Sequence, residues 1–308
     1  MAPATLKLTN RSPRKPIRGL PASVEIPVDV TVDNVKVLIA RQCGISDHNR
    51  IGLFNPATNK TLKDRNAIVL ADADISRGKE LLVKDLGPQI SWKMVFVIEY
   101  LGPLLVHPLI LFLRPYIYPW ATPTPLSDTQ RLAFGLVMAH FVKRELETLF
   151  VHKFSNSTMP VFNIFRNSAF YWIFYGLVSA YAIYSPTSLA ATADEPLVDL
   201  VGTVIFVLAE LANGSVHLHL SSLRSRGGTE RKIPTGLGFS LVTCPNYMFE
   251  VIAWVGAVIA TRSWGLALSV ALGITYMAAW AKGKERAYRK EFPDKYKKKR
   301  YVMLPGLI

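Results

Sequence analysis

The sequence predicts an all-α polytopic membrane domain with about six transmembrane helices, preceded by a small α+β domain. Three observations support this fold class. Half of the 308 residues are hydrophobic and the mean hydropathy is +0.23, although 19% of the residues are charged. Residues 1–86 hold short β-prone runs and one helical pattern, whereas residues 90–308 alternate apolar segments with charged or proline-rich connections. Such a mixture is typical of a polar domain joined to a membrane domain.

Residues 1–86 are predicted to form a cytosolic domain of short strands around one helix. Apolar residues recur at helical spacing from Val32 to Cys43, and Gly44 follows as a suitable C-cap. With Thr61-Leu62-Lys63-Asp64, this order of elements resembles the ubiquitin-like β-grasp, whose plain interpretation is a folded adaptor without a catalytic role. Gly87-Pro88 is a natural boundary to the second domain. The β-prone runs are Thr5–Thr9, Ala22–Ile26, Arg50–Phe54 and Leu81–Lys84.

Six apolar segments follow Trp92 and are the candidate transmembrane helices. Several are shorter than the roughly 20 residues that cross the hydrocarbon core, so flanking Trp and Tyr residues must complete them. The last two lie on either side of Arg262-Ser263-Trp264 and are expected to form a tight helical hairpin. Five or seven spans remain alternatives. The six segments are Val95–Leu113, Leu132–Val151, Ala169–Tyr184, Leu197–Ala212, Met248–Ala260 and Gly265–Ala281.

The basic residues predict the orientation in the membrane. The net charge is +14, and the first residues contain no apolar stretch typical of a cleaved signal peptide. With a cytosolic N-terminus, the basic stretches 143–153, 224–232 and 282–300 all lie in the cytosol, as the positive-inside rule requires. Both termini are therefore expected to be cytosolic. The charge also suits anionic lipid or a polyanionic substrate, whereas nucleic-acid binding is disfavoured because the basic residues flank apolar spans.

A polar motif stands at the start of the fifth predicted span. Asn246, Tyr247 and Glu250 lead directly into the apolar run 251–260. Hydrocarbon penalises an unsatisfied polar group heavily, so polar side chains at this depth usually line a functional cavity. The motif therefore predicts chemistry inside a membrane, with Tyr247 as the leading candidate for a proton donor.

Two further carboxylates lie within predicted spans. Glu99 lies about one turn inside the first span, near Pro103, which must kink the helix. A buried carboxylate is unfavourable unless it is paired or protonated, so Glu99 is predicted to be functional, with structural pairing as the alternative. Glu210 lies near Asn213 at the cytosolic end of the fourth span, where hydrogen bonding between helices explains it as well as function does.

The cytosolic ends of the spans carry residues suited to phosphate groups. Lys143 and Glu147 are four residues apart, so they can form an interfacial salt bridge or a substrate-binding mouth that receives anionic phosphates. The loop 221–234 contains Arg224, Arg231 and Lys232, and guanidinium forks suit phosphate recognition. Together with the polar motif at the fifth span, these residues predict a nucleotide site at the cytosolic membrane face.

Several other classes of protein are excluded or disfavoured. Only two cysteines are present, which excludes a disulfide framework and a Cys-rich zinc site. His217-Leu218-His219 could ligate a metal, but the clustered histidines of membrane di-iron enzymes are missing, so no metal is expected. Gly236-Leu237-Gly238 does not complete the dinucleotide fingerprint of a Rossmann domain. No serine or cysteine stands in a convincing nucleophile motif.

Four motifs carry a resemblance to a known family. They are the run 142–152, Pro245-Asn246-Tyr247 with Glu250, and the runs 280–284 and 288–292. Together they resemble the very-long-chain trans-2-enoyl-CoA reductases of the steroid 5α-reductase superfamily, over nearly the whole chain. The resemblance implies a multi-pass enzyme of the endoplasmic reticulum membrane, performing the last reduction of fatty-acid elongation for lipid and sphingolipid biosynthesis. It also implies NADPH as cofactor, a very-long-chain enoyl-CoA substrate, surrounding membrane lipid, and other elongation-cycle enzymes as partners.

The same resemblance implies roles for individual residues. Tyr247 would be the proton donor and Glu99 the second catalytic residue. His217 stands where steroid-reducing relatives have an acidic residue, and Lys284 stands where they have histidine, which argues against a steroid substrate. The NADPH-binding residues would be Asn213, Arg224, Arg231, Lys232, Asn246, Glu250, Lys284 and Tyr288.

The residue types fit the expected reaction. Hydride transfer to the β-carbon of an enoyl thioester builds negative charge on the carbonyl oxygen, and a phenol that donates to this oxygen or protonates the α-carbon stabilises it. Glu99 would orient the phenol or relay a proton. The alternatives within enzymes are reduction of steroid or polyprenol double bonds, and methyl transfer by the related isoprenylcysteine methyltransferases. A non-enzymatic membrane adaptor that displays its ubiquitin-like domain is the third alternative.

Overall fold

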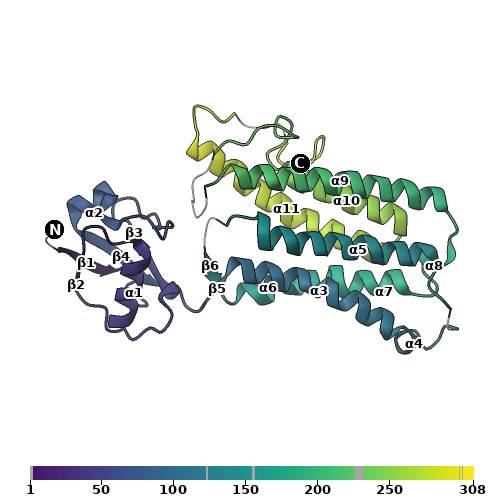
Figure 1. The fold of residues 1–308 in the computed structure, drawn as a ribbon, viewed down its shortest axis with the longest axis horizontal. Helices are drawn as coiled ribbons and strands as arrows, with labels where there is room; N and C mark the ends of the chain where they lie inside the picture. The colour runs from purple at the N-terminus through teal and green to yellow at the C-terminus, as the bar shows by residue number, and fades with distance from the viewer. Residues whose placement is uncertain (1–2, 123, 155–156, 226–231, 298, 300) are drawn as a thin grey trace. The chain divides into compact units, whose positions relative to one another are not determined.

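The computed structural model describes the chain except residues 1–2, 123, 155–156, 226–231, 298 and 300. The chain divides into two compact units (Figure 1). The N-terminal unit comprises Met1–Trp92 with Phe154–Asn163 and Ser225–Glu230, and the helical unit comprises Lys93–Lys153, Ile164–Arg224 and Arg231–Ile308.

The N-terminal unit contains a four-stranded mixed sheet in the order β2-β1-β4-β3. Strand β1 pairs antiparallel with β2 and parallel with β4, and β3 pairs antiparallel with β4. Each predicted strand, and the predicted helix, lies within one residue of its observed bounds. The assignment to the β-grasp stays a prediction. The elements are β1 (Ala4–Asn10), β2 (Ser23–Ile26), α1 (Val32–Gln42), η1 (His48–Arg50), β3 (Ile51–Phe54), η2 (Val69–Ala71), α2 (Ala73–Gly78) and β4 (Glu80–Asp85).

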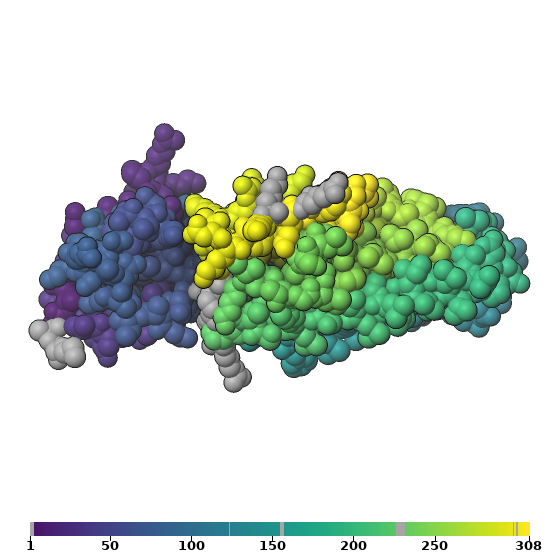
Figure 2. All heavy atoms as spheres, turned by 90° about the horizontal axis from the view of Figure 1, so that it is seen from above, coloured from purple at the N-terminus to yellow at the C-terminus, as the bar shows by residue number. Residues whose placement is uncertain are grey.

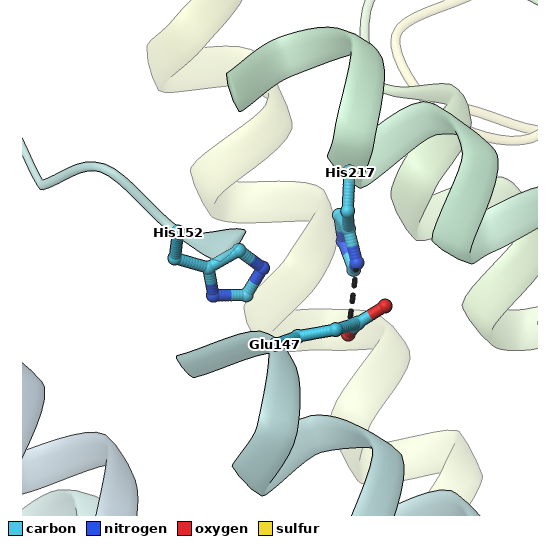
Figure 3. Close-up of side chains that lie close together, drawn as sticks. All are labelled: Glu147, His152 and His217. Carbon is cyan, nitrogen blue, oxygen red and sulfur yellow. Dashed lines mark ion pairs between the residues drawn. The ribbon is translucent and has the colours of Figure 1, made fainter. Parts of the chain in front are cut away.

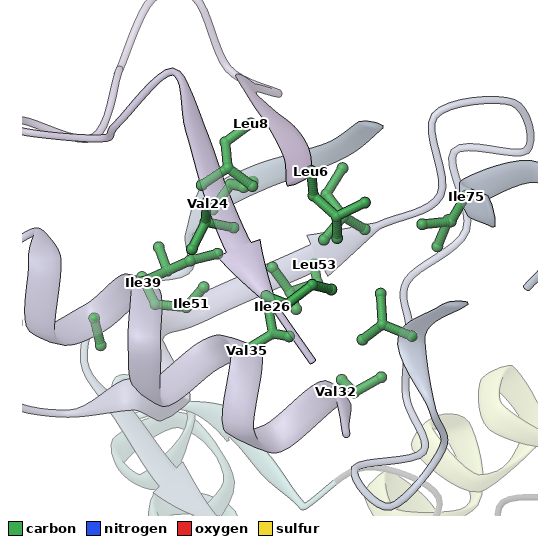
Figure 4. Packing of buried hydrophobic residues seen from close by; sticks show 14 of the residues in the cluster. Leu6, Leu8, Val24, Ile26, Val32, Val35, Ile39, Ile51, Leu53 and Ile75 are labelled. Carbon is green, nitrogen blue, oxygen red and sulfur yellow. The ribbon is translucent and has the colours of Figure 1, made fainter. Parts of the chain in front are cut away.

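The core of this unit forms where α1 packs on one face of the sheet. Alternation along β1 and β2 points Leu6 and Ile26 toward the helix, where Val35 and Ile39 meet them (Figure 4). The side chain of Thr31 caps α1 by accepting a hydrogen bond from the Asn34 N–H. The core is therefore built from local alternation and one amphipathic helix.

The helical unit is built from long helices, two of which contain π-helical turns. A short ladder between β5 (Gln89–Ser91) and β6 (Thr158–Pro160) belongs to the N-terminal unit and immediately precedes the first long helix. The helical elements are α3 (Trp92–Phe112), α4 (Arg114–Ile117), α5 (Asp128–Leu146), η3 (Glu147–Val151), α6 (Asn163–Phe170), η4 (Tyr171–Val178), α7 (Ser179–Tyr184), α8 (Leu189–Thr192), α9 (Pro196–Ser222), α10 (Pro245–Thr261) and α11 (Trp264–Glu291).

Among the described residues, α3, α9 and α11 are long and apolar enough to cross a membrane. The segments α5, α6 to α7, and α10 correspond to the other predicted spans, but six spans stay a prediction. The helices α9 and α11 extend beyond the predicted spans: α9 continues from Ala212 to Ser222, and α11 continues from Ala281 to Glu291. The helices continue because their polar side chains, such as Asn213 and Glu285, find buried hydrogen-bond partners.

Gly202 of α9 and Gly256 of α10 let these two helices touch. A Cβ atom on Gly202 would lie 2.5 Å from the backbone nitrogen of Ala260, and one on Gly256 would lie 2.6 Å from that of Phe206. Because no side chain fits at either glycine, the helices pack backbone to backbone and run side by side (Figure 1). This packing brings the polar residues of α9 against the first turns of α10.

Candidate functional site

Buried and partly buried polar side chains gather where α3, α5, α9 and α10 meet. We call this group the polar network. Its side chains all come from positions that face the interior of the helical unit, and they are linked by hydrogen bonds and ion pairs. The members are Tyr100, His140, Lys143, Arg144, Glu147, Glu210, Asn213, His217 and Glu250.

Asn213 joins α9 to the start of α10. Its Nδ2 atom donates to the Asn246 carbonyl at 2.9 Å and to Glu250 Oε2 at 3.1 Å. Its Oδ1 atom accepts from Lys143 Nζ at 2.6 Å. The structure thus brings together Asn213, Asn246 and Glu250, three of the residues expected to hold the cofactor.

His140 bridges the carboxylates of two different helices. Its Nδ1 atom lies 2.5 Å from Glu210 Oε1, and its Nε2 atom lies 3.4 Å from Glu250 Oε1. Lys143 Nζ lies 2.9 Å from the second oxygen of Glu210. Glu210 and Glu250 therefore share one histidine, and Glu210 has Lys143 as a second basic partner. Carboxylates in a low-dielectric interior require such partners. Glu210 takes part in contacts between helices, which was one of its two expected explanations.

Arg144 holds a second part of the network. Its NH1 atom lies 2.5 Å from Glu147 Oε2, and its NH2 atom donates to the Tyr100 hydroxyl at 2.8 Å. His217 Nδ1 lies 3.0 Å from the same Glu147 oxygen. Glu147 opens the π-helical turn η3, and such turns are frequent at functional sites because they redirect side chains.

The predicted pair of Lys143 and Glu147 is present, with a distance of 3.0 Å between Nζ and Oε1. Glu147 is buried and Lys143 is partly exposed, and Lys143 also contacts Asn213 and Glu210. Sequence reasoning missed His140 and Arg144. The signal was available, since 140, 143, 144 and 147 recur on one face of a helix and all four residues are ionisable.

Glu147, His152 and His217 each offer a ligand atom within 4.8 Å of the others (Figure 3). Burial, with the positive charge of Arg144 nearby, lowers the pKa of His152 to about 3, so its ring is neutral. However, Arg144 and Lys143 already neutralise Glu147. A divalent cation would have to displace two positive groups, so the geometry favours a hydrogen-bonded cluster over a metal centre.

Tyr247 lies in the first turn of α10, half-buried, beside Lys284 of α11. The ammonium nitrogen lies 4.6 Å from the centre of the phenol ring. The preceding segment is anchored by Glu285, whose carboxylate accepts hydrogen bonds from Thr243 Oγ1, from the Tyr296 hydroxyl at 2.8 Å and from the Lys299 N–H at 3.2 Å. Glu285 of α11 therefore joins the segment just before α10 to the C-terminal segment.

Glu99 is buried in α3, next to Tyr100 of the network. Among the described residues, its Oε1 atom has no hydrogen-bond partner. No hydrogen bond, ion pair or ring contact in this part of the chain links Glu99 to Tyr247. The two residues expected to act together are thus held by different neighbours.

The remaining predicted cofactor residues lie toward the end of α9 and along α11. Arg224 NH1 donates to the Lys153 carbonyl at 2.5 Å, and Lys153 Nζ donates to the Arg224 carbonyl at 2.6 Å. Lys232 is exposed, and Arg231 lies outside the described residues. Tyr288 lies one turn beyond Lys284 and stacks on Tyr296, with ring centres 5.2 Å apart.

Comparisons with known proteins agree with the resemblance stated above. The family model described as 3-oxo-5-alpha-steroid 4-dehydrogenase matches residues 157–308. A very-long-chain enoyl-CoA reductase from Dictyostelium discoideum is 40% identical, over 90% of this chain and 92% of that protein. A protein named as a probable very-long-chain enoyl-CoA reductase from Caenorhabditis elegans is 41% identical, over 90% of this chain and 91% of the relative. A trans-2,3-enoyl-CoA reductase-like protein from Mus musculus is 30% identical, over 90% and 78%.

These relatives align with both the N-terminal and the helical parts of the chain, and the family model covers the polar motif at α10 and all of α11. We conclude that the chain belongs to the very-long-chain enoyl-CoA reductase family.

Proposed function

We propose that this protein reduces the trans-2 double bond of very-long-chain enoyl-CoA to give the saturated acyl-CoA, with NADPH as hydride donor. The observation that carries this proposal is the position of Tyr247. Its phenol lies beside the ammonium of Lys284, one turn from Glu250 of the polar network, in a chain about 40% identical to enoyl-CoA reductases. A proton donor next to a set of nucleotide-binding side chains is what such a reduction requires.

The described residues fit a nicotinamide dinucleotide. Arg144 Nε and Thr148 Oγ1 are buried without hydrogen-bond partners among the described residues. Such atoms cost about 1–3 kcal/mol each, a cost that a polar ligand would relieve. Asn213, Asn246 and Glu250 would bind hydroxyl and amide groups. The cationic side chains of the loop after α9 and of α11 would bind the phosphates. These are Arg224, Arg231 and Lys232 in the loop and Lys284 on α11, with Tyr288 beside Lys284.

The cofactor, when bound, supplies a hydride to the β-carbon of the enoyl thioester. Tyr247 donates a hydrogen bond to the carbonyl oxygen, where negative charge develops, or gives its proton to the α-carbon. Lys284 stabilises the phenol oxygen once it loses its proton, because an ammonium lies beside it. Glu99 of α3 would be the second polar group, which orients the phenol or relays a proton.

The substrate is expected to lie partly in lipid. Its acyl chain would run among the apolar helices, and the CoA phosphates would meet the basic ends of the spans. Lys143 and Glu147 were predicted to meet those phosphates. Their contacts with Asn213 and His217 support a role in shaping the site beside the substrate.

We place this enzyme, as a proposal, in the endoplasmic reticulum membrane as the last reductive step of the fatty-acid elongation cycle. It would span the membrane six times with both termini in the cytosol, carry a ubiquitin-like domain at residues 1–86 and a reductase domain at 90–308, and work with the other enzymes of the cycle. The basic loops between apolar spans support this orientation.

Oxidation of NADPH by the purified protein with a long trans-2-enoyl-CoA tests the reaction directly. Tyr247→Phe should lower kcat by at least about 10²-fold, the lower range for a positioned acid. Tyr276→Phe, an exposed tyrosine on α11, is the matched control and should retain activity. Full activity of Tyr247→Phe would remove this residue from the mechanism.

Steroid reduction is the second candidate, because the family model is described by that activity. Turnover of a 3-oxo-4-ene steroid, with none of the enoyl-CoA, would favour it. Binding of S-adenosylmethionine in place of NADPH would instead indicate the methyltransferase branch.

A further inference from the structure

A strongly basic loop joins β1 to β2 in the N-terminal unit. Residues 11–18 read Arg-Ser-Pro-Arg-Lys-Pro-Ile-Arg, with four cations and no acidic residue. Figure 2 shows an early, purple segment of this unit standing away from its body. We call residues 11–18 the basic loop. The proposed reductase chemistry does not use it.

The basic loop is held in place rather than hanging free. Ile17 is buried in the core, and its N–H donates to Asn10 Oδ1 at 2.9 Å. At the other end, the Arg11 N–H donates to the Val83 carbonyl at 2.8 Å. An internal turn joins the Lys15 N–H to the Ser12 carbonyl at 3.0 Å. Anchors at both ends force the cations between them to point outward.

These cations lack acidic partners. Arg14, Lys15 and Arg18 are exposed, and among the described residues no carboxylate pairs with any of them. Arg11 lies over the Phe54 ring, 3.9 Å from its centre. Elsewhere in the same unit, Arg50 and Arg65 each contact an aspartate at 2.5 Å. A fixed group of unpaired cations is suited to a surface of negative charge.

The membrane around the helical unit is such a surface, and the chain holds the basic loop close to it. Strand β4 ends at Asp85 and the candidate span α3 begins at Trp92, so six residues separate the sheet from the membrane. Six extended residues reach about 20 Å at most. A cytosolic leaflet is anionic, and its field decays over about 8 Å at physiological salt. Because this tether is short, the basic loop meets lipid headgroups at a high effective concentration, whereas soluble anions are dilute.

We propose that the basic loop binds anionic lipid headgroups of the membrane in which the helical unit is embedded, and so docks the N-terminal unit on that surface. Each of the three exposed cations would raise the ratio of docked to free N-terminal unit about fivefold, so together they would raise it by about 10²-fold. The attraction is electrostatic and sequence-tolerant, so it falls as salt rises.

The test places the full chain in nanodiscs of pure phosphatidylcholine or of phosphatidylcholine mixed with phosphatidylserine. A dye on Pro13→Cys, in a Cys43→Ser background, reports contact through quenching by lipid that carries a spin label on its headgroup. Cys244 is buried and stays unlabelled. Quenching is expected in the anionic discs, is expected to be weak in the zwitterionic discs, and should fall with added salt.

The triple variant Arg14→Gln, Lys15→Gln, Arg18→Gln should lower the docked-to-free ratio by about 10²-fold. The matched control Arg41→Gln, Lys60→Gln, Lys63→Gln removes the same charge from exposed positions elsewhere in the unit and should retain quenching. Equal quenching in both kinds of disc, or quenching that survives in the triple variant, would overturn the proposal. If soluble polyphosphate protects the basic loop from proteolysis in zwitterionic discs, the ligand of the loop would be a free anion and not a lipid headgroup. None of these readouts depends on reductase activity.

Discussion

The two units bury opposite kinds of side chain. In the described part of the N-terminal unit, Asn55 is the one polar residue that is buried. The helical unit buries His140, Arg144, Glu147 and Glu210, although it is the unit that contains the candidate membrane spans. Apolar burial stabilises a fold directly, whereas buried ion pairs roughly offset their own desolvation. The N-terminal core is therefore the stabilising part of its unit, whereas the polar network adds little net stability to the helical unit.

Removing one charge from the polar network should produce the largest effect. Arg144→Met would leave Glu147 and the Tyr100 hydroxyl without their partner, at a cost of about 3–5 kcal/mol in unfolding free energy, toward the lower end because Lys143 still contacts Glu147. Thermal unfolding in nanodiscs measures this cost. The exposed Arg131→Met is the control and should change stability by less than about 1 kcal/mol. Equal effects of the two variants would contradict the contrast between burial and exposure.

A cavity in the N-terminal core should lower the unfolding free energy by about as much, but it should leave cofactor binding unchanged. Ile39→Ala is expected to lower the stability of this unit by about 2–5 kcal/mol, because a fully buried side chain is lost. Hydrogen exchange of the β-sheet amides reports the loss. NADPH affinity should be unchanged, so a matching loss of affinity would show that the cores are not separate.

The hydrogen bonds of Glu285, which hold the segment before Tyr247, offer a finer test. Glu285→Ala should lower kcat about tenfold or more, since losing hydrogen bonds to a charged group amounts to about 1.5–3 kcal/mol. The KM for NADPH should change little if Glu285 acts through Tyr247. Glu285→Gln keeps acceptor oxygen and should recover part of kcat. A uniform loss of both parameters in both variants would indicate general unfolding instead.

The smallest expected effect is a pH dependence in the N-terminal unit. The hydrogen bond from Arg50 lowers the pKa of Asp85 below its usual value. Its stabilisation is therefore present above the unfolded pKa of about 3.9 and is lost as the pH falls through the lower folded pKa. Both side chains are about one-third exposed, so solvent screening limits the effect to less than about 1 kcal/mol. Asp85→Asn should remove this acid dependence from exchange of the β3 and β4 amides.

Local patterns predicted most of the elements. Alternation and helical spacing marked the strands and helix of the N-terminal unit to within one residue, because each buries one regular face. The hairpin at Arg262-Ser263-Trp264 was also predicted, and α10 and α11 meet there. The ends of α9 and α11 lie beyond the predicted spans, because polar residues in a sequence indicate the end of a span. Those residues continue the helix because partners on neighbouring helices satisfy them.

The sequence by itself determined that a polar motif stands at the start of an apolar helix. Asn246, Tyr247 and Glu250 are polar at a position where hydrocarbon would penalise them, and this needs no knowledge of neighbours. Only the tertiary structure decided what each of them contacts. It recruited His140 and Arg144, joined Asn213 to Glu250, set Lys284 beside Tyr247, and gave Glu99 different neighbours from Tyr247. Spacing along one helix shows which residues share a face, but helix packing decides which helix that face contacts. Here the close approach at Gly202 and Gly256 sets α9 against α10.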